Sequence, residues 1–242
     1  MCGGSDVLSG VGAEFGMIIV LVGPPGAGKG THGRRISAKR NLPHVSSGDL
    51  LRDAVERGTP LGLEAAEYMK AGNLVPDSIM LSWVEELLDK PDYVNGLVLD
   101  GFPRTVPQAE GLDELLARRG LAVDAVLHFD IDEKAAVRRL GSRVSCSRCG
   151  VVYNLISNPP DDPEVCGRCG GKLEVRDDDR VDTIRARFEE FRRLTEPMLE
   201  YYRSRGKVSV ISTEGAIESV GSRVTAVLDG LRDRGDSESV AP

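Results

Sequence analysis

A glycine-rich stretch that contains a lysine is the first part of the chain whose residue types suggest chemistry. Residues 23–31 read GPPGAGKGT and directly follow an apolar run. Glycines let successive backbone N–H groups turn toward phosphate oxygens, and the N-terminus of a following helix adds a favourable dipole. Lys29 would reach the β- and γ-phosphates and a hydroxyl would contact Mg²⁺, although Gly30 separates the lysine from Thr31. The stretch predicts a phosphate-binding loop; the alternative is a glycine-rich turn without a ligand.

Four of the five cysteines form two closely spaced pairs. The pairs have the form C-x-x-C and are sixteen residues apart, at Cys146, Cys149, Cys166 and Cys169. A glycine follows each pair and permits the tight turn that aims N–H groups at thiolate sulfur. Four thiolates at this spacing predict a closed, structural zinc site. Iron or disulfides are alternatives, and a nucleic-acid-binding ribbon is opposed by the few aromatic and basic residues around the pairs.

Acidic and basic side chains complete the candidate site. Asp100 ends an apolar strand, where an acid commonly faces Mg²⁺; the alternative is an aspartate that caps a turn.

The basic residues are mostly arginines. The chain has 24 Arg and 7 Lys, and residues 138–193 hold eleven Arg, one Lys and ten acids. Arginine presents a planar fork to phosphate, and phosphoryl transfer depends on positioning and charge neutralisation. The net charge of −7 opposes binding to nucleic acid through bulk charge.

The elements that must position these residues follow from apolar runs. Short strands are predicted at 17–22, 42–45, 96–99, 125–129 and 208–211, and helices at 80–88, 109–118 and 184–202. Alternating strands and helices predict an α/β fold with a parallel sheet. No run of 18 apolar residues is present, so no transmembrane helix is expected.

The predicted organisation is one domain with two insertions and two disordered ends. The domain covers residues 17–231, with a helical insertion at 46–75 and a Gly-, Pro- and Cys-rich insertion at 142–179. Residues 1–16 form a glycine-rich extension and residues 232–242 a polar tail. Cys2 lies in the extension and is expected to have no role.

Several strings together resemble the adenylate kinases. The loop at 23–31 has the Gly-x-Pro-Gly-x-Gly-Lys-Gly-Thr form of nucleoside monophosphate kinases. SSGDLLR at 46–52 is similar to the acceptor-nucleotide segment of adenylate kinases, and DGFPRTVPQ at 100–108 to their most recognisable string. VVY at 151–153 and PP at 159–160 are similar to their zinc-bearing lid. The resemblance extends from residue 17 to about 231. It implies a P-loop three-layer fold with a five-stranded parallel sheet, a helical AMP-binding insert and a zinc lid.

The resemblance also implies an activity and a role for individual residues. The activity is Mg·ATP + AMP ⇌ 2 ADP, in a cytoplasmic monomer that contacts neither nucleic acid nor membrane. The implied ATP-binding residues are Gly26, Ala27, Gly28, Lys29, Gly30, Thr31, Arg139, Arg143, Val152 and Tyr153. The implied AMP-binding residues are Ser47, Gly48, Arg52, Asn73, Leu74, Val75, Gly101, Phe102, Pro103, Arg104, Gln108, Arg176 and Arg187. The implied catalytic residues are Lys29, Arg104, Arg139, Arg143, Arg176 and Arg187.

Further details of the resemblance concern orientation. Arg139 and Arg143 are expected on one face of a helix end, and Gln108 is expected to be exposed and to pair with adenine. Asp100 would reach Mg²⁺ through water. Asp178 and Asp179 match an acidic pair behind the lid, with capping of the next helix as the alternative.

Two positions depart from the common family pattern, and two other activities remain open. His32 stands where glutamine is common, which is expected to affect helix-surface contacts only. Ser47 stands where threonine is frequent, which would loosen the preference for AMP slightly. The alternatives are another nucleoside monophosphate kinase, or a P-loop ATPase with a zinc-ribbon interaction module.

Overall fold

The computed structural model describes residues 17–238 apart from positions 72 and 94. The predicted extension at 1–16 and residues 239–242 lie outside the described residues. Five strands form one parallel sheet in the order β2-β3-β1-β4-β8. They are β1 (Met17–Val22), β2 (His44–Ser46), β3 (Gly96–Asp100), β4 (Ala125–Asp130) and β8 (Val208–Ser212). The predicted α/β fold with a five-stranded parallel sheet is therefore confirmed.

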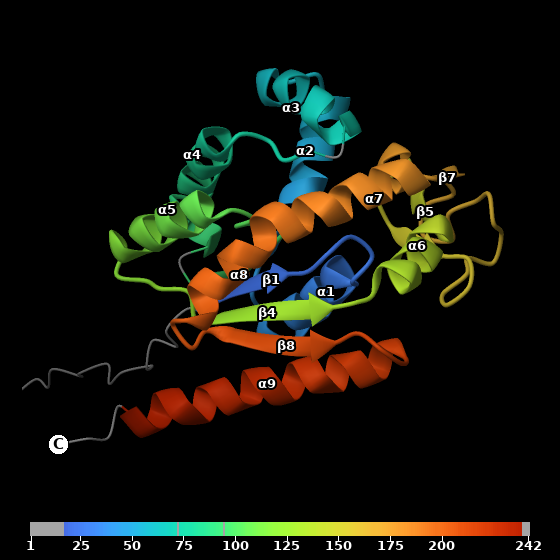
Figure 1. Cartoon of the computed structure of the whole chain (residues 1–242). Coiled ribbons are helices and arrows are strands. Elements are labelled where there is room, and N and C mark those ends of the chain that lie inside the picture. Colours follow the sequence, from blue (N-terminus) through green and yellow to red (C-terminus); the bar gives the residue numbers. More distant parts are fainter. Residues whose placement is uncertain (1–16, 72, 94, 239–242) are drawn as a thin grey trace, which may run out of the picture.

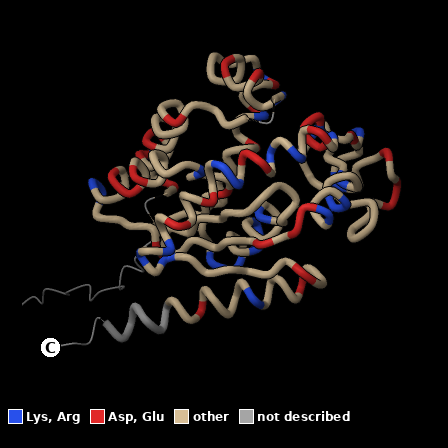
Figure 2. Tube along the Cα trace, viewed as in Figure 1, with Lys and Arg blue, Asp and Glu red and all other residues tan. Residues whose placement is uncertain are grey.

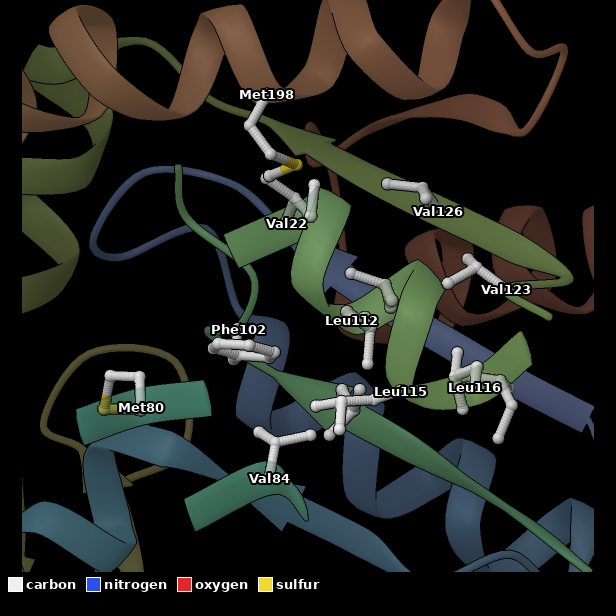
Figure 3. Packing of buried hydrophobic residues seen from close by; sticks show 14 of the residues in the cluster. Val22, Met80, Val84, Phe102, Leu112, Leu115, Leu116, Val123, Val126 and Met198 are labelled. Atoms are coloured by element: carbon white, nitrogen blue, oxygen red, sulfur yellow. The ribbon is translucent and has the colours of Figure 1, made fainter. Parts of the chain in front are cut away.

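Helices cover both faces of this sheet, which makes three layers (Figure 1). Helices α1 (Lys29–Arg40) and α9 (Ile217–Glu238) cover one face, and α4 (Asp77–Leu88), α5 (Val106–Ala117) and α8 (Glu196–Arg203) the other. Successive side chains of a strand point to opposite faces. Ile18 and Val20 of β1 therefore pack with Leu112, whereas Ile19 and Leu21 pack on the opposite face. Figure 3 shows the larger cluster, with Phe102 beside the residues of α4 and α5.

A long helical run links the core to the second insertion, residues 142–179, which we call the lid. The predicted helix at 184–202 appears as α7 (Val181–Glu190), a π-helical segment Phe191–Thr195 and α8. Ile184, Phe188 and Met198 are buried, as their spacing predicts. Figure 1 shows this run passing between the two insertions.

The first insertion is a pair of helices, α2 (Ser47–Glu56) and α3 (Pro60–Ala71). Ser46 caps α2 by accepting a hydrogen bond from the backbone N–H of Asp49 at 3.2 Å. Gly62 permits the two helices to touch, because a Cβ there would lie 2.0 Å from the carbonyl oxygen of Ala54. A short 3₁₀ turn, η1 (Pro91–Tyr93), follows α4 and precedes β3.

The second insertion follows α6 (Glu133–Gly141) and contains a small antiparallel sheet. Its strands are β5 (Arg143–Cys146), β6 (Val152–Asn154) and β7 (Leu173–Glu174), in the order β6-β5-β7. A 3₁₀ turn, η2 (Asp177–Asp179), leads into α7. These strands are too short to appear as apolar alternation in the sequence.

Helix α9 extends past residue 231, where the sequence predicts a frayed tail to begin. Val220, Val224 and Leu228 repeat every four residues and bury one face of this helix against the sheet. None of the helices within the described residues is long and apolar enough to span a membrane.

Candidate active site

The glycine-rich loop connects the buried strand β1 to α1, so its backbone is held at the carboxyl edge of the sheet. Gly28 adopts φ 87° at the N-cap of α1, a left-handed conformation that residues with a Cβ rarely adopt. Gly23 is required for space, because a Cβ there would lie 2.5 Å from the carbonyl oxygen of Phe129. Lys29 opens α1, and its Nζ donates hydrogen bonds to the carbonyl oxygens of Gly23 at 2.6 Å and Pro24 at 3.0 Å.

Positive charge is concentrated around this lysine. Burial lowers the pKa of Lys29 to about 7, with Asp100 opposing the shift and Arg104 and Arg187 adding to it. Gly30 faces Asp100, since a Cβ at Gly30 would lie 3.3 Å from Asp100 Oδ2. Asp100 ends β3 and is buried close enough to Lys29 to raise its pKa.

A first pocket lies between the helical insertion and α5, and we call it the insert pocket. Leu51, Met69, Val75 and Met80 line its apolar side. Polar and backbone groups complete the lining at Ser47, Gly48, Arg52, Asn73, Leu74, Gly101, Arg104, Gln108, Asp178 and Arg187. The pocket therefore pairs an apolar wall with a set of guanidinium groups, an arrangement suited to a base and its phosphate.

A second pocket lies over the glycine-rich loop, and we call it the loop pocket. Gly23, Pro25, Lys29 and Pro103 line it together with residues of the π-helical segment. It shares four lining residues with the insert pocket, namely Leu74, Gly101, Arg104 and Arg187. Two binding spaces therefore meet at a pair of guanidinium groups.

Figure 2 marks basic positions in blue and acidic positions in red along the Cα trace, and the predicted arginines are fixed in place by specific partners. Arg187 donates to Asp178 Oδ2 at 3.0 Å, and Arg143 Nε donates to Asp179 Oδ2 at 2.7 Å. The Asp179 side chain has no exposed area. A buried carboxylate needs a partner of opposite charge, and Arg143 is that partner. Asp178 and Asp179 thus hold arginines, and no side chain caps α7.

The remaining arginines are held by neighbouring polar atoms. Arg104 Nε donates to the carbonyl oxygen of Gly101 at 2.7 Å, and Arg139 donates to that of Thr213 at 2.7 Å. Arg176 Nε donates to Ser145 Oγ at 2.8 Å. Burial, together with Arg187, lowers the pKa of Arg104 to about 10, and burial beside Arg52 does the same for Arg176. This crowding of positive charge favours an anionic ligand.

Ion pairs also connect the two insertions. Arg176 of the lid lies 3.9 Å from Asp49 of α2, and Arg52 of α2 lies 3.8 Å from Asp178. Burial opposes ionisation of Asp178, yet Arg187 and Arg52 hold its pKa below the usual range. The arginines therefore surround a space bounded by α2, α7 and the lid.

Three sequence expectations about orientation are wrong. Arg139 lies in α6 but Arg143 begins β5, so they do not share a helix face. Gln108 is 2% exposed because it lies in the first turn of α5 and its amide hydrogen-bonds Asp77 and the backbone of Arg104. His32 is 4% exposed and stacks on Phe129 at 5.5 Å between ring centroids, so its contacts lie in the core.

Other predicted residues lie at or near these pockets through their backbone. Phe102 and Ala27 are 1% exposed and belong to the hydrophobic clusters, so their side chains serve the core. Gly26 has a left-handed backbone, and Thr31 is half-buried in the first turn of α1. Ser47 Oγ donates to the carbonyl oxygen of Gly101 at 2.8 Å, which fastens α2 to the end of β3.

The four lid cysteines form one cluster. Their Sγ atoms lie within 4.8 Å of one another, with 3.5 Å between Cys146 and Cys169 and 3.7 Å between Cys149 and Cys166. Tetrahedral Zn–S bonds of about 2.3 Å place sulfur atoms about 3.8 Å apart, so the donor set fits zinc. Gly171 is needed here, since a Cβ would lie 2.9 Å from Cys146 Sγ.

Val152 and Tyr153 lie in β6 next to this cluster. Both are half-buried, and the Tyr153 hydroxyl lies 3.8 Å from Cys166 Sγ. Val144 and Leu173 supply the apolar part of the small lid core. Since that core is small, most of the order of the lid must come from the cysteine cluster.

Sequence reasoning missed the residues that hold the predicted ones. Asp77 accepts a hydrogen bond from Gln108 Nε2 at 2.7 Å, and Ser145 holds Arg176. An aspartate after a proline resembles an ordinary first residue of a helix, and a lone serine carries no signal, so no motif could have identified them.

Comparison with known proteins agrees with this geometry. The model of the adenylate kinase family matches residues 21–207. The chain is 44% identical over 216 residues to the adenylate kinase of Archaeoglobus fulgidus, which covers 89% of this chain and 100% of that protein. It is 45% identical to that of Methanothrix thermoacetophila, over 88% of this chain and 98% of that protein. It is 44% identical to that of Geobacillus sp., over 89% of this chain and 100% of that protein.

Proposed function

The chain belongs to the adenylate kinase family, and from this premise we propose how its residues carry out the family reaction. It transfers a phosphoryl group reversibly between ATP and AMP, giving two ADP. The single observation that supports the residue assignment best is that the insert pocket and the loop pocket share Arg104 and Arg187. A phosphoryl group that passes between two nucleotides must cross such a junction.

In the proposed assignment, AMP occupies the insert pocket. The adenine lies against Leu51, Val75 and Met80, near Gln108 and the backbone of residues 73–75. Its phosphate lies between Arg52 and Arg104, because guanidinium forks bind phosphate oxygens in pairs. The segment 46–75 is the AMP-binding insert.

ATP occupies the loop pocket in the same assignment. Backbone N–H groups of residues 26–31 and the ammonium group of Lys29 bind its phosphates, because they meet at the N-terminus of α1. Arg139 and Arg143 bind from the base of the lid, and Val152 and Tyr153 pack on the nucleotide. Adenylate kinases use Mg²⁺ with ATP; Asp100 would hold its water ligands here, and the ion would neutralise phosphate charge.

The lid, residues 142–179, is a zinc-stabilised element in this proposal. The support is the close approach of four Sγ atoms in a segment with little apolar core. The lid carries Arg143 and Arg176 over the phosphates, where it excludes water that could otherwise accept the phosphoryl group.

We also propose that the protein acts as a cytoplasmic monomer that does not bind nucleic acid. Cysteines that bind a metal must stay reduced, and the cytoplasm is a reducing compartment. The net charge of −7 repels nucleic acid. Light scattering during size-exclusion chromatography should give one chain of 26.1 kDa, and a dimer would contradict the proposal.

A coupled assay with a panel of acceptors tests the function. ADP formation from Mg·ATP should be fastest with AMP and much slower with GMP, CMP or UMP. A preference for another monophosphate would identify a different nucleoside monophosphate kinase. ATP hydrolysis at an equal rate without any acceptor would identify an ATPase, an alternative that no observation on this chain favours.

A further inference from the structure

The Gln108 amide makes two hydrogen bonds at the apolar side of the insert pocket. The backbone N–H of Arg104 donates to Oε1 at 2.8 Å, and Nε2 donates to Asp77 Oδ1 at 2.7 Å. Gln108 lies in the first turn of α5, whereas Asp77 is the first residue of α4. The Gln108 side chain, which lines the insert pocket, is therefore held by two separate parts of the chain, residue 104 before α5 and Asp77 of α4.

These two partners allow only one orientation of the amide. A backbone N–H can only donate a hydrogen bond, and a carboxylate can only accept one. Turning the amide over would place its NH₂ group against the N–H of Arg104 and its oxygen against Asp77. Both hydrogen bonds would be lost in a buried place, so the orientation is fixed before any ligand binds.

Asp77 is itself fixed by a second hydrogen bond. Its Oδ2 accepts from the hydroxyl of Thr105 at 3.0 Å, and Thr105 Oγ1 accepts from the backbone N–H of Gln108 at 3.2 Å. The carboxylate thus bridges the cap of α5 and the amide of the same helix. It cannot shift toward the pocket without breaking this bridge.

The fixed amide leaves one N–H and one oxygen lone pair uncommitted among the hydrogen bonds of the described residues. Adenine presents a matching pair, because its N6 amino group donates and its N1 accepts. Hypoxanthine and guanine present the opposite pair, since O6 accepts and N1–H donates. An amide that could turn over would accept either pattern, whereas a fixed one discriminates between them.

We propose that Asp77 is a specificity-determining positioning residue that selects an aminopurine at the acceptor site by fixing the orientation of Gln108. This proposal rests on the proposed binding of AMP in the insert pocket. IMP is the sharpest probe, because it has the shape of AMP with the donor and acceptor exchanged and carries no additional amino group.

The experiment compares AMP with IMP in four single variants. Asp77→Ala removes the acceptor. Asp77→Ser removes the carboxylate, including the Oδ1 atom that accepts from Gln108, while keeping a polar first residue for α4 in case the alanine variant is unstable. Asp77→Asn keeps an oxygen for Gln108 Nε2. Ser78→Ala, at the exposed neighbour of Asp77, is the matched control. The readout is the ratio of kcat/KM for AMP to that for IMP, which does not depend on the folded fraction.

We expect the ratio to fall about tenfold or more in Asp77→Ala and Asp77→Ser, mainly through KM for AMP. Asp77→Asn should retain a ratio within about threefold of the unmodified chain, and Ser78→Ala should not change it. In a Gln108→Ala background, Asp77→Ala should have no further effect, because its action passes through the amide.

An unchanged ratio in both Asp77→Ala and Asp77→Ser overturns the proposal, even if kcat falls for both acceptors. A ratio in Asp77→Asn as low as in Asp77→Ala overturns it as well. The activity of the unmodified chain tests the proposed function separately from the role of Asp77. If that chain forms no ADP from ATP and AMP, the proposed function fails, whereas a normal rate with an unaffected variant ratio defeats the role of Asp77 alone.

Discussion

Lys29 is a basic side chain that is largely removed from water and lies close to several arginines. Both conditions disfavour its charged form. Its pKa is lowered to about 7, first by burial, and Arg104, Arg187 and Arg143 add to the shift against Asp100. A neutral lysine is tolerated there, while a protonated one requires a counter-ion. Bound phosphates would supply that counter-ion, so nucleotide binding and protonation of Lys29 should be linked.

The linkage predicts proton uptake when Mg·ATP binds. Above about pH 7 the free protein holds Lys29 mostly neutral, and the negative phosphates raise its pKa again, so a proton must be taken up. We expect uptake approaching one proton at about pH 8.5, where the ATP phosphates are fully ionised, and much less at about pH 6. Titration calorimetry in buffers of different ionisation enthalpy measures the number of protons.

Two variants test whether Lys29 is the group concerned. Lys29→Met should abolish the uptake and lower kcat by about 10²- to 10³-fold, as the loss of one preorganised charge at the transferred group does. Lys39→Met lies on the same helix and should change neither quantity. Binding heats that do not depend on the buffer at pH 8.5 would contradict the assignment.

At the scale of elements, the lid illustrates how a segment without a large core can be ordered. Val144 and Leu173 are among its few buried apolar residues. Cys146 ends β5, and the other three cysteines lie in the turns that connect the short strands. The strands align the two C-x-x-C turns, and a bound metal would in turn hold the strands. Folding of the lid and binding of the metal should therefore be one process.

Metal removal should therefore destabilise the lid. We expect about one zinc per chain by elemental analysis, and none in Cys149→Ser. Each 1 kcal/mol lost shifts Tm by about 2–4 °C in a chain of this size, so a fall of at least about 5 °C is expected with the variant or a chelator. Cys2→Ser makes the same change at the fifth cysteine and should leave both values unaltered. A fully stable, metal-free protein would disprove the zinc site.

Elements were more predictable from the sequence than the contacts between them. The run 17–22 corresponds to β1 without adjustment, because a buried parallel strand is apolar throughout. The strands of the lid were missed because they are too short for a period to appear. The family resemblance predicts surface positions for Gln108 and His32, whereas their burial depends on Asp77 and Phe129, which are distant in sequence.

At the scale of the whole molecule, the two pockets are joined at shared arginines, and the insert pocket has one further arginine of its own. Arg52 lines only the insert pocket, and Arg104 and Arg187 line both. Arg139 is held at the base of the lid by Thr213. In the proposed assignment, this positive charge extends from the acceptor nucleotide toward the donor nucleotide.

This arrangement predicts three different kinetic patterns. Arg52→Ala should raise KM for AMP about tenfold or more with little effect on KM for ATP. Arg139→Ala should raise KM for ATP by a similar factor with little effect on KM for AMP. Arg187→Ala should raise both and lower kcat, because it removes charge from the junction. Initial rates over a grid of both nucleotide concentrations give the constants. If Arg187→Ala altered only one KM, the shared junction would be refuted.

The π-helical segment Phe191–Thr195 has a consequence for how the chain can vary in length. A π-turn contains one residue more than an α-turn, and a residue turns a helix by about 100°. The wider turn takes up this extra residue with little rotation of α7 relative to α8, so deletion of one residue here would restore an α-helix and leave Arg187 and Met198 facing nearly the same sides as now. Over generations, the spacing between Arg187 and Met198 should therefore change by the gain or loss of such a wide turn, with both side chains kept on their present faces.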